Sequence, residues 1–568
     1  MSDVKSLQPL QPSPGIQRDG TNFDVKGVGY IDGQWVRFQR GRPRKMGGFI
    51  RVSDRLSAPV RASIVTPYNA TARILSFSVR GVESILVDNN GLGSFIVDRT
   101  PTAFAQNDNY LWSVGTMYDD AAGADKSIVL SVATASLRAL DTIDVGQVYQ
   151  GNVFDETAFT AVSGLTCRGL FVTQPYAIYY GPNGSVTWSN ANEPFNTTTG
   201  DAGSDRVTSD GIVAGLSLPT GSGPGGLLFS LTSVIRMDWV GGQAIFRFGK
   251  LTTSSSIISQ NAVVEFDGGY FWAGVDKFYV SDGQSVTELE NNTNKNWFFD
   301  NLNRECSTKI WATKNTRFGE VIWYFPYGDN EECSHAVVFN IREKVWYDYE
   351  LSRTAGSYYK SNPVQYAISS NNLYKVITEN LTGTIAEGDI VKVDASGATF
   401  EVISVQGVVY FIKHTNNVEF VAGATIDVIG DTDTADIVTF TETCGLFLHE
   451  FGKDHVEGDF FYAIKSHFTT SNVSLLSADQ SINLWTRFLR IEPDFIQTGN
   501  LSLSVLTKEY AKSPEVVHGP YTFTNTTEKI DPYIQGRLIS LKFESNESGG
   551  DYQMGKCLLH LEAGDPRS

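Results

Sequence analysis

Short runs in which apolar and polar residues alternate fill most of the chain, and Gly, Asn and Asp residues separate these runs. A period of two is typical of half-buried β-strands, whereas the 3.6-residue period of amphipathic helices is nearly absent. The 53 Gly, 34 Phe and 24 Tyr among 568 residues agree with many turns and aromatic strands. The chain is therefore predicted to be a large all-β protein.

One strand–turn–strand–turn–strand unit recurs along the chain. It occurs in "RILSFSVRGVESILVDNNGLGSFIVDR", "GLLFSLTSVIRMDWVGGQAIFRFGKL", "GGYFWAGVDKFYVSDGQSVTEL" and "GEVIWYFPYGDNEECSHAVVFNIREKVWYDYE". The last three units start at Leu227, Tyr270 and Val321, so their spacings are 43 and 51 residues. Antiparallel units of three or four strands at such spacings indicate the blades of a β-propeller. A meandering β-sandwich is the alternative, because no Trp-Asp repeat marks the units.

Residues 361–443 differ from the rest of the chain. Two similar Gly-, Asp- and Thr-rich halves, "EGDIVKVDASGATFEVI" and "AGATIDVIGDTDTADIV", flank the apolar strand "GVVYFIKH". Three Lys oppose eleven acidic residues there, so the segment has a net charge of −8. Strand patterns of the larger body resume at "GLFLHEFGKDHVEGDFFYAIKSHF". We expect a small β-barrel or β-sandwich domain inserted into a surface loop of the body.

The charge and the cysteines exclude several classes of protein. A net charge of −18 disfavours binding to duplex DNA unless the charge is strongly partitioned. No run of about 18 apolar residues predicts a membrane span, and the start, "MSDVKSLQPLQPSPG", does not resemble a secretory signal. Five scattered cysteines fit reduced thiols of a protein made in a cytoplasm.

Three motifs resemble ligand sites without the structural context that such sites need. Gly221, Gly223 and Gly226 match the dinucleotide pattern, but a strand follows them instead of a helix. "HEFGKDH" has Lys453 where a zinc protease has its second His. Cys333 and His335 form a lone pair on a predicted strand. No catalytic, metal-binding or cofactor-binding residue is predicted.

A glycosidase needs two carboxylates that face each other across a cleft. Asp276, Asp282 and Glu288 lie near predicted turns, where Asp is ordinary hairpin chemistry. Several aromatic residues could form a sugar platform, but at alternate positions within strands they are expected to be blade packing. These residues are Trp272, Trp323, Phe325, Trp346 and Tyr347.

Three blocks, taken in order, resemble one family. The first is "GVGYIDGQWVRFQRGRPRKMGGF"; the central one runs from "SLTSVIRMDWVGGQAIFRFGKL" through "NKNWFFDNLN" to "FGEVIWYFPYGDNEECSHAVVFNIREKVWYD". The third comprises "FLRIEPDF", "GPYTFTNTTEKIDPYIQGRLISLKFES" and "MGKCLLHLEAGDPR". Their order resembles the tail nozzle proteins of short-tailed bacteriophages, also called packaged-DNA stabilisation proteins or tail tubular protein B. The resemblance fades in residues 100–200 and is absent from 361–443.

The resemblance implies a structural virion protein without catalysis. Such proteins form a ring, usually a hexamer, below the portal and its adaptor ring. The ring extends the DNA exit channel, retains packaged DNA and attaches tail fibres or tailspikes. It passes double-stranded DNA without sequence-specific binding and does not insert into a membrane. Assembly takes place in the host cytoplasm, and the mature protein belongs to the virion tail.

The resemblance also divides the chain into four parts. Residues 1–60 are expected to form an N-terminal arm and platform strands, and residues 61–360 a propeller-like body. The insert 361–443 follows. Residues 444–568 would complete the body and supply the C-terminal platform strands.

A basic stretch, "GQWVRFQRGRPRKMGGF", stands out in this acidic chain. We expect a strand over Gln34–Phe38 and a turn over residues 40–43. Arg37, Arg40, Arg42, Arg44 and Lys45 are then either a solvated hairpin tip or a patch that docks on an acidic adaptor ring or touches DNA phosphates. Docking is favoured over DNA contact, because a basic ring would grip the DNA that it has to release.

Two other functions remain open. One is a glycan-binding or glycan-cleaving β-propeller of a phage or bacterial surface, which a cleft with paired carboxylates would favour. The other is a secreted adhesin, which the absence of a recognisable signal peptide disfavours.

Overall fold

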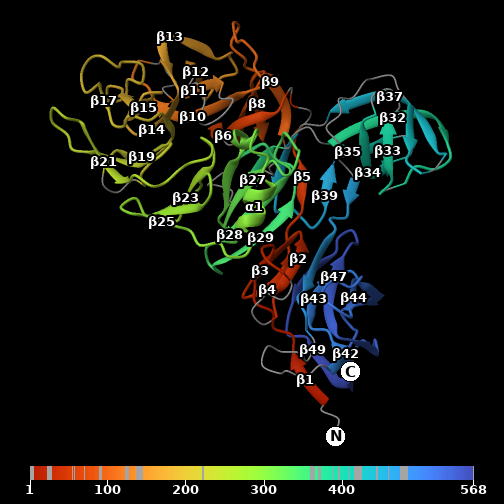
Figure 1. Ribbon diagram of the computed structural model, residues 1–568. Coiled ribbons are helices and arrows are strands. Elements are labelled where there is room, and N and C mark those ends of the chain that lie inside the picture. The colour runs from red at the N-terminus through yellow and green to blue at the C-terminus, as the bar shows by residue number, and fades with distance from the viewer. Residues whose placement is uncertain are drawn as a thin grey trace.

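The computed structural model describes residues 5–21, 28–53, 56, 58–68, 71–87, 93–121, 127–135, 145–219, 223–358, 365–368, 373–386, 388–393, 397–406, 409–414, 425–430, 432–442, 445–457, 460–473 and 484–566. Within these ranges the regular structure is almost entirely antiparallel β-strand. The exceptions are α1 (Lys295–Asn301) and one 3-10 turn, Ser307–Lys309. The predicted class is confirmed: an all-β propeller, a platform of strands from both ends of the chain, and an inserted small β domain (Figure 1).

Six blades of the propeller are four-stranded sheets in which each strand pairs with the next along the chain. Their strands are β6–β9 (Val60–Tyr68, Thr71–Ser78, Gly81–Val87, Gly93–Asp98), β10–β13 (Tyr110–Tyr118, Ser127–Ala135, Gly146–Asn152, Thr160–Cys167), β14–β17 (Gly169–Thr173, Tyr176–Tyr180, Ser185–Trp188, Gly203–Arg206), β18–β21 (Ile212–Ser217, Gly225–Ser230, Val234–Trp239, Phe246–Thr252), β22–β25 (Val263–Phe266, Gly269–Ala273, Phe278–Ser281, Val286–Glu288) and β26–β29 (Trp311–Asn315, Glu320–Phe325, His335–Asn340, Val345–Glu350). Each of the four units recognised in the sequence corresponds to the last three strands of a blade.

The seventh blade is assembled from three distant parts of the chain. Its strands, in spatial order, are β30 (Ala355–Tyr358), β31 (Gln365–Ile368), β38 (Leu446–His449) and the N-terminal β5 (Phe49–Arg51). β30 lies beside both β26 and β6, so it closes the ring between the sixth and first blades. The same sheet continues through β39 (His455–Glu457) and β40 (Phe460–Tyr462).

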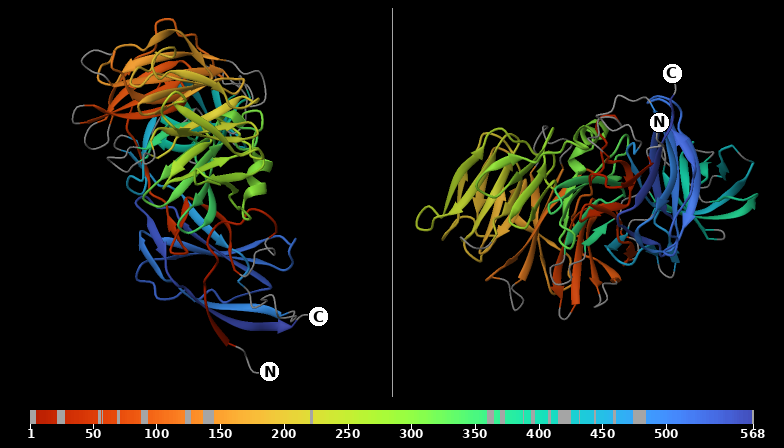
Figure 2. Two further views of the ribbon diagram at one scale, coloured as in Figure 1. Left: turned by 90° about the vertical axis from the view of Figure 1, so that its left-hand side faces the viewer. Right: turned by 90° about the horizontal axis from the view of Figure 1, so that it is seen from below.

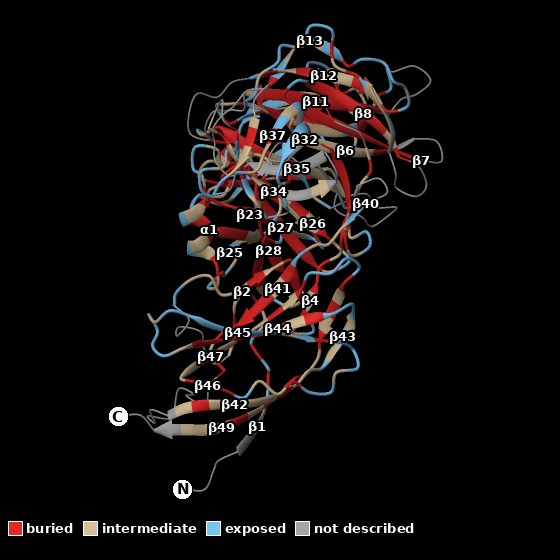
Figure 3. Cartoon of the chain, turned by 90° about the vertical axis from the view of Figure 1, so that its right-hand side faces the viewer, coloured by how far each residue is buried: buried red, intermediate tan, exposed pale blue. Residues whose placement is uncertain are grey.

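Aromatic side chains fill the space between blades. Trp323 of β27 and Trp346 of β29 stack with their ring centroids 5.8 Å apart, and Phe278 of the preceding blade contacts both rings. Both tryptophans are buried, as the sequence predicted. Their indole N–H groups donate to the carbonyls of Ala262 and Glu290. The strands hold most of the buried residues, and the turns that join them are exposed (Figure 3).

The inserted domain is a closed six-stranded barrel between β31 and β38 of the seventh blade. Its strands, in the order in which they pair, are β32 (Leu373–Thr382), β35 (Val409–His414), β34 (Thr399–Gln406), β33 (Ile390–Val393), β36 (Thr425–Val428) and β37 (Thr434–Glu442). It has its own apolar core, which includes Val376, Val391, Phe400 and Ile426. Figure 1 shows the barrel projecting beside the propeller.

The platform consists of three sheets that combine strands from both ends of the chain. They are β1-β49-β42-β46 (Lys5–Pro9, Leu558–Pro566, Leu484–Glu492, Ile534–Gly536), β2-β41-β47-β44-β45 (Tyr30–Gln34, Ser466–Thr470, Leu538–Ser545, Leu501–Lys508, Val516–Phe523) and β3-β4-β48-β43 (Val36–Gln39, Arg42–Lys45, Asp551–Met554, Phe495–Thr498). The platform lies on one side of the propeller, and the sheet that contains β1 and β49 is farthest from it (Figures 1 and 2).

These strands place the boundaries between parts differently from the sequence analysis. β5 belongs to the propeller, although it falls within residues 1–60. β31 also belongs to the propeller, although it falls within 361–443, so the barrel itself spans Leu373–Glu442. Both strands pair with β38, which starts 78 residues after the end of β31 and nearly 400 after β5. Each also has a second partner, β30 for β31 and β39 for β5. Such non-local pairing leaves no local pattern to mark it.

Candidate functional site

The basic stretch forms a tight hairpin of β3 and β4. Val36 pairs with Lys45, and Gln39 pairs with Arg42. Arg40 and Gly41 form the turn with φ of 54° and 68°, the two positive values that a two-residue type I′ hairpin requires. The expected turn over residues 40–43 is therefore wrong, since β4 begins at Arg42. Glu343 accepts hydrogen bonds from both turn amides, at 2.8 and 3.0 Å.

Arg37 is buried and does not belong to any surface patch. Its Nε donates to Glu320 Oε1 at 2.8 Å, and its Nη1 donates to Glu450 Oε2 at 3.0 Å. The guanidinium also lies over the ring of Phe318, 3.6 Å from its centroid. The hydroxyl of Tyr347 donates to Glu320 as well. Arg37 therefore joins the platform to the sixth blade and to the segment that follows β38.

The two carboxylates of this cluster respond differently to burial. Burial raises the pKa of Glu320, and the charge of Arg37 offsets only part of this effect. Burial also opposes the ionisation of Glu450, but Arg37 outweighs it and holds the pKa of Glu450 below its ordinary value. Gly47 allows Glu450 to approach, because a Cβ at Gly47 would lie 2.3 Å from Glu450 Oε2.

Lys45 is buried too, although the sequence placed it in the docking patch. Its Nζ has no hydrogen-bond partner within the described part of the chain. Burial lowers the pKa of Lys45 to about 8, although the charges of Asp454 and Asp551 act in the opposite direction. A patch of all five basic residues is therefore wrong, because the side chains of Arg37 and Lys45 are buried.

The other three basic residues reach the surface to different degrees. Arg40 is exposed, whereas Arg42 and Arg44 are half-buried. Arg42 Nη1 donates to the carbonyl of Gly555 at 2.9 Å, and Arg44 Nη1 donates to Gln39 Oε1 at 2.8 Å. Any docking role of this hairpin must rest on these three residues.

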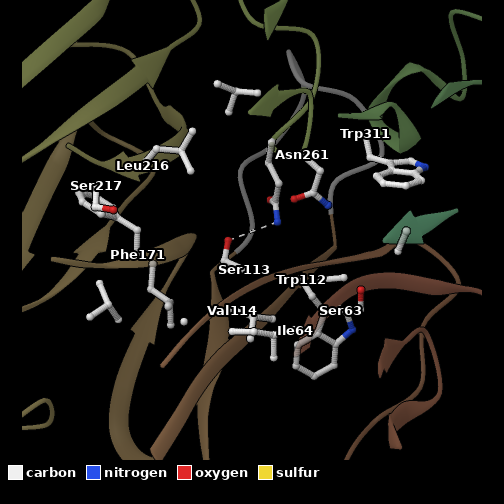
Figure 4. Close-up of a pocket in the computed structure, with 18 of the residues that line it drawn as sticks. Ser63, Ile64, Trp112, Ser113, Val114, Phe171, Leu216, Ser217, Asn261 and Trp311 are labelled. Atoms are coloured by element: carbon white, nitrogen blue, oxygen red, sulfur yellow. Dashed lines mark hydrogen bonds between the residues drawn. The ribbon is translucent and has the colours of Figure 1, made fainter. Parts of the chain in front are cut away.

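A second candidate site is the cavity at the centre of the propeller. It has a volume of about 750 Å³, and the first strand of every blade, or the turn next to it, contributes to its wall. Figure 4 shows Ser63, Ser113, Ser217 and Asn261 around the open space, with Phe171 and Leu216 on one side of it. This site was not predicted from the sequence, because these first strands lie outside the repeating units.

The carboxylates considered for glycosidase chemistry lie elsewhere. Asp282 Oδ1 accepts hydrogen bonds from the amides of Gln284 and Ser285 in its own turn. Glu288 is paired with Lys277 at 3.2 Å on an outer strand. Asp276 lies in the turn between β23 and β24. The five aromatic residues considered as a sugar platform are buried between or within blades.

The other motifs fold as ordinary structure where they are described. His449 is buried and accepts a hydrogen bond from Arg353 Nε at 2.9 Å; burial, together with Arg353, lowers the pKa of His449 well below its ordinary value. Gly226 lies in β19, and Gly221 lies outside the described residues. The four described cysteines are free thiols, and Cys444 lies outside the described residues. Among the described residues, no group of three His, Cys, Asp or Glu could hold a metal ion, and no helix is long and apolar enough to cross a membrane.

Of the comparisons with known proteins, only the one with solved structures found similar proteins. No protein-family model matches the chain, and no curated protein matches it. The chain is similar to the WD40 β-propeller domain of Doa1 (9% identity, 57% of this chain and 94% of that chain, TM-score 0.36) and to the RRP9 WD40 repeats (10%, 65% and 99%, 0.35). It is also similar to an exo-beta-1,3-galactanase from Phanerochaete chrysosporium (9%, 91% and 100%, 0.29). Likenesses of this size bear on neither family nor activity.

Proposed function

We propose that the chain is a structural protein of a short-tailed bacteriophage, a subunit of the tail nozzle ring that extends the DNA exit channel below the portal and adaptor. In this proposal the ring is a homo-oligomer, six copies in the family that the sequence resembles. It retains packaged DNA, attaches fibres or tailspikes, and performs no catalysis. It would be assembled in the host cytoplasm and belong to the virion tail. The three sequence blocks described above motivate the family.

The observation that carries the proposal is the platform. The first and third sequence blocks are more than 400 residues apart, yet their strands form common sheets outside the propeller. A propeller is already a closed body, so a second β unit that combines both chain ends supports a separate assembly role. The basic hairpin lies in this same unit.

Exposed apolar side chains on the platform support contacts between copies. Ile496 is 77% exposed and Tyr533 is 70% exposed. Tyr510, Val516 and Val517 are also exposed and lie around the loop that joins β44 to β45; we call these three residues the apolar hairpin. Exposed apolar residues that gather in one patch typically mark a protein interface, and the apolar hairpin is our candidate for such a patch. Ring formation would bury it.

The docking role proposed for the basic hairpin is now confined to Arg40, Arg42 and Arg44. These residues reach the surface of the platform, so they remain available to an acidic adaptor ring. Reversal of all three to Glu is expected to block joining to an adaptor-bearing particle while the subunit stays folded. Normal assembly of the reversed variant would contradict a docking role and show that the hairpin is only a solvated turn.

Oligomeric state tests the proposal directly. Electron microscopy and sedimentation of the purified chain are expected to show rings with an axial hole. The double variant Val516→Glu/Val517→Glu should remain folded but lose the ring, because four new charges per pair of contacting hairpins would have to be buried. The matched control is Val240→Glu/Val275→Glu, two exposed valines at turns of the propeller, and it should form rings normally.

Other outcomes would count against the nozzle. A chain that remains a monomer at high concentration and on adaptor-bearing particles would contradict it. Equal loss of rings in both double variants would show that the apolar hairpin is not the contact. The cavity in the propeller does not favour glycan cleavage, because no Asp or Glu is among the described residues that line it.

A further inference from the structure

The central cavity of the propeller has the size and the polar lining of a small-molecule binding site. All seven blades contribute to its wall, chiefly through their first strands. Its volume of about 750 Å³ lies within the range of about 300–1,000 Å³ typical of small-molecule sites. A site on rigid strands holds its polar groups in fixed directions, which favours recognition of a specific arrangement of ligand groups.

Neutral hydrogen-bonding groups surround the cavity. The first strands of three blades supply the hydroxyls of Ser63, Ser113 and Ser217, and the segment before β22 supplies the side-chain amides of Gln260 and Asn261. Figure 4 shows Ser113 and Asn261 near the open space, with a hydrogen bond drawn from the neighbouring amide to Ser113. Hydroxyls and amides together can both donate and accept.

Part of this hydrogen-bonding capacity is only weakly used. Ser63 Oγ lies below the cavity surface, out of reach of a ligand, so the accessible groups are those of the other residues. Gln260 Nε2 donates to Ser113 Oγ at 3.3 Å, and the Ser113 hydroxyl lies 3.4 Å from that of Tyr180, both longer than good hydrogen bonds. Buried polar groups normally find partners, so these groups are available to a ligand with hydroxyls of its own.

The charges around the cavity do not favour a charged ligand. No Asp or Glu occurs among the described lining residues, so nothing there would hold a metal ion or an amine. Among the lining residues that the structure describes, one side chain is cationic, that of Arg61. Both terminal nitrogens of Arg61 are held by Glu332 at 2.6 Å, so its charge is already balanced and offers little attraction to a phosphate or carboxylate.

Apolar groups also line the cavity. Phe171 and Leu216 lie on the side of Ser217, and Trp311 lies on the side of Asn261 (Figure 4). A ligand that fits must therefore combine several neutral hydroxyls with a patch of C–H groups. Sugars have this combination, and recognition of sugars relies on amides, hydroxyls and apolar contacts at once.

We propose that the propeller cavity binds a neutral saccharide of one or two rings, without cleaving it. This inference does not depend on the nozzle: a propeller of a ring subunit and a propeller of a free protein could both bind the sugar. In a virion such a site would allow the tail to contact glycans directly. Binding is expected to be weak, at roughly millimolar concentration, because a small sugar makes few contacts.

Saturation-transfer NMR on the full chain tests the proposal with glucose, galactose, N-acetylglucosamine, lactose and maltose as probes. We expect at least one sugar to give a saturable signal. Gln260→Leu should weaken it by about tenfold or more, because the substitution removes an amide that faces the cavity and replaces it with an apolar group. Ser217→Leu, on the opposite wall, should act in the same direction. Gln284→Leu, on an exposed turn of an outer strand, is the matched control and should bind as the wild type does.

Each other result overturns the proposal. No saturable signal with any probe up to roughly 50 mM would exclude a saccharide site. Equal binding by the wild type and by both folded cavity variants would place any sugar elsewhere on the molecule. Displacement by inorganic phosphate would indicate an anion site. A thermal melt of each variant verifies folding, and ring formation measured in the same preparations keeps failure of this inference separate from failure of the nozzle.

Discussion

The blades and the platform both consist of antiparallel β-strands, but the strands that pair are close in sequence in the blades and distant in the platform. In six blades each strand pairs with the next strand along the chain. In the platform β1 pairs with β49 and β2 pairs with β41, across most of the sequence. The blades therefore depend on local pairing and the platform on long-range pairing. Ile496 at 77% and Tyr533 at 70%, both on the platform, are more exposed than any large apolar side chain described in the six blades. A local repeat thus builds the propeller from units that pair within themselves. The non-local sheets form the platform, for which we propose the role in assembly.

The most severe change to the blade side of this comparison is Trp323→Ala. Trp323 is fully buried between the fifth and sixth blades, so the variant should lose about 3–5 kcal/mol of unfolding free energy. Urea denaturation measures this loss. Trp239→Ala, at a residue that is 46% exposed, should cost far less. Equal costs for the two variants would show that blade packing does not distinguish them.

On the platform side, Arg37→Met removes the cation that joins the two regions. Glu320 and Glu450 would then remain buried without a balancing charge, which typically costs about 3 kcal/mol or more. Denaturation followed separately by fluorescence and by limited proteolysis of the platform should show that the junction loosens first. Arg40→Met on the same hairpin should remain within about 0.5 kcal/mol of the wild type. A wild-type melt for Arg37→Met would contradict the proposed junction.

Lys45 gives the platform a distinctive response to alkaline pH. Its pKa is about 8 in the folded chain and higher when unfolded, so the unfolded state holds more protons between pH 8 and about 10.5. The contribution of Lys45 to stability is therefore present above the unfolded pKa and is lost as the pH falls through 8. Relative to Lys45→Met, the wild type should gain roughly 2 kcal/mol from pH 8 to 10.5. Parallel pH profiles of the two proteins would contradict this.

The smallest effect is expected for removal of the barrel. Replacement of Leu373–Glu442 by a short Gly-Ser linker should leave the cooperative melting of the rest within about 1 kcal/mol of the wild type, because the barrel has a separate core and loop length affects stability only weakly. Scanning calorimetry measures this. Loss of the cooperative transition would mean that the seventh blade needs the barrel to hold β31 against β38.

The pattern of apolar and polar residues predicted those parts of the fold in which paired strands are close in sequence. Alternation and the recurring three-strand unit gave the all-β class and the propeller, and the change of composition marked the inserted domain. The first strand of each blade escaped notice: β26, for instance, reads Trp-Ala-Thr-Lys-Asn, with Lys314 and Asn315 obscuring the alternation. The seventh blade could not be predicted, because no local signal connects β5 to β38.

The candidate site illustrates the same limit. The basic cluster is visible in the sequence. The partners of the buried Arg37 are Glu320 and Glu450, which are 283 and 413 residues away in the chain. The one available signal was Glu320 itself, an acidic residue at the start of the otherwise apolar strand "EVIWYF". A charge that begins a buried strand requires a partner. Sequence alone could not show which of the nearby arginines supplies it.

The three-part seventh blade also sets the order in which the chain can fold as it leaves the ribosome. Six blades and β31 are complete by Ile368, but β38 starts only at Leu446, after the barrel. At bacterial and eukaryotic synthesis rates of about 5–20 residues per second, translation of the intervening segment takes roughly 4–15 s. During that interval the edge of β31 that will pair with β38 has no partner. β5, which was synthesised much earlier, also lacks β38. The seventh blade is therefore completed late, and until then its unpaired strand edge is a place where a neighbouring chain can pair.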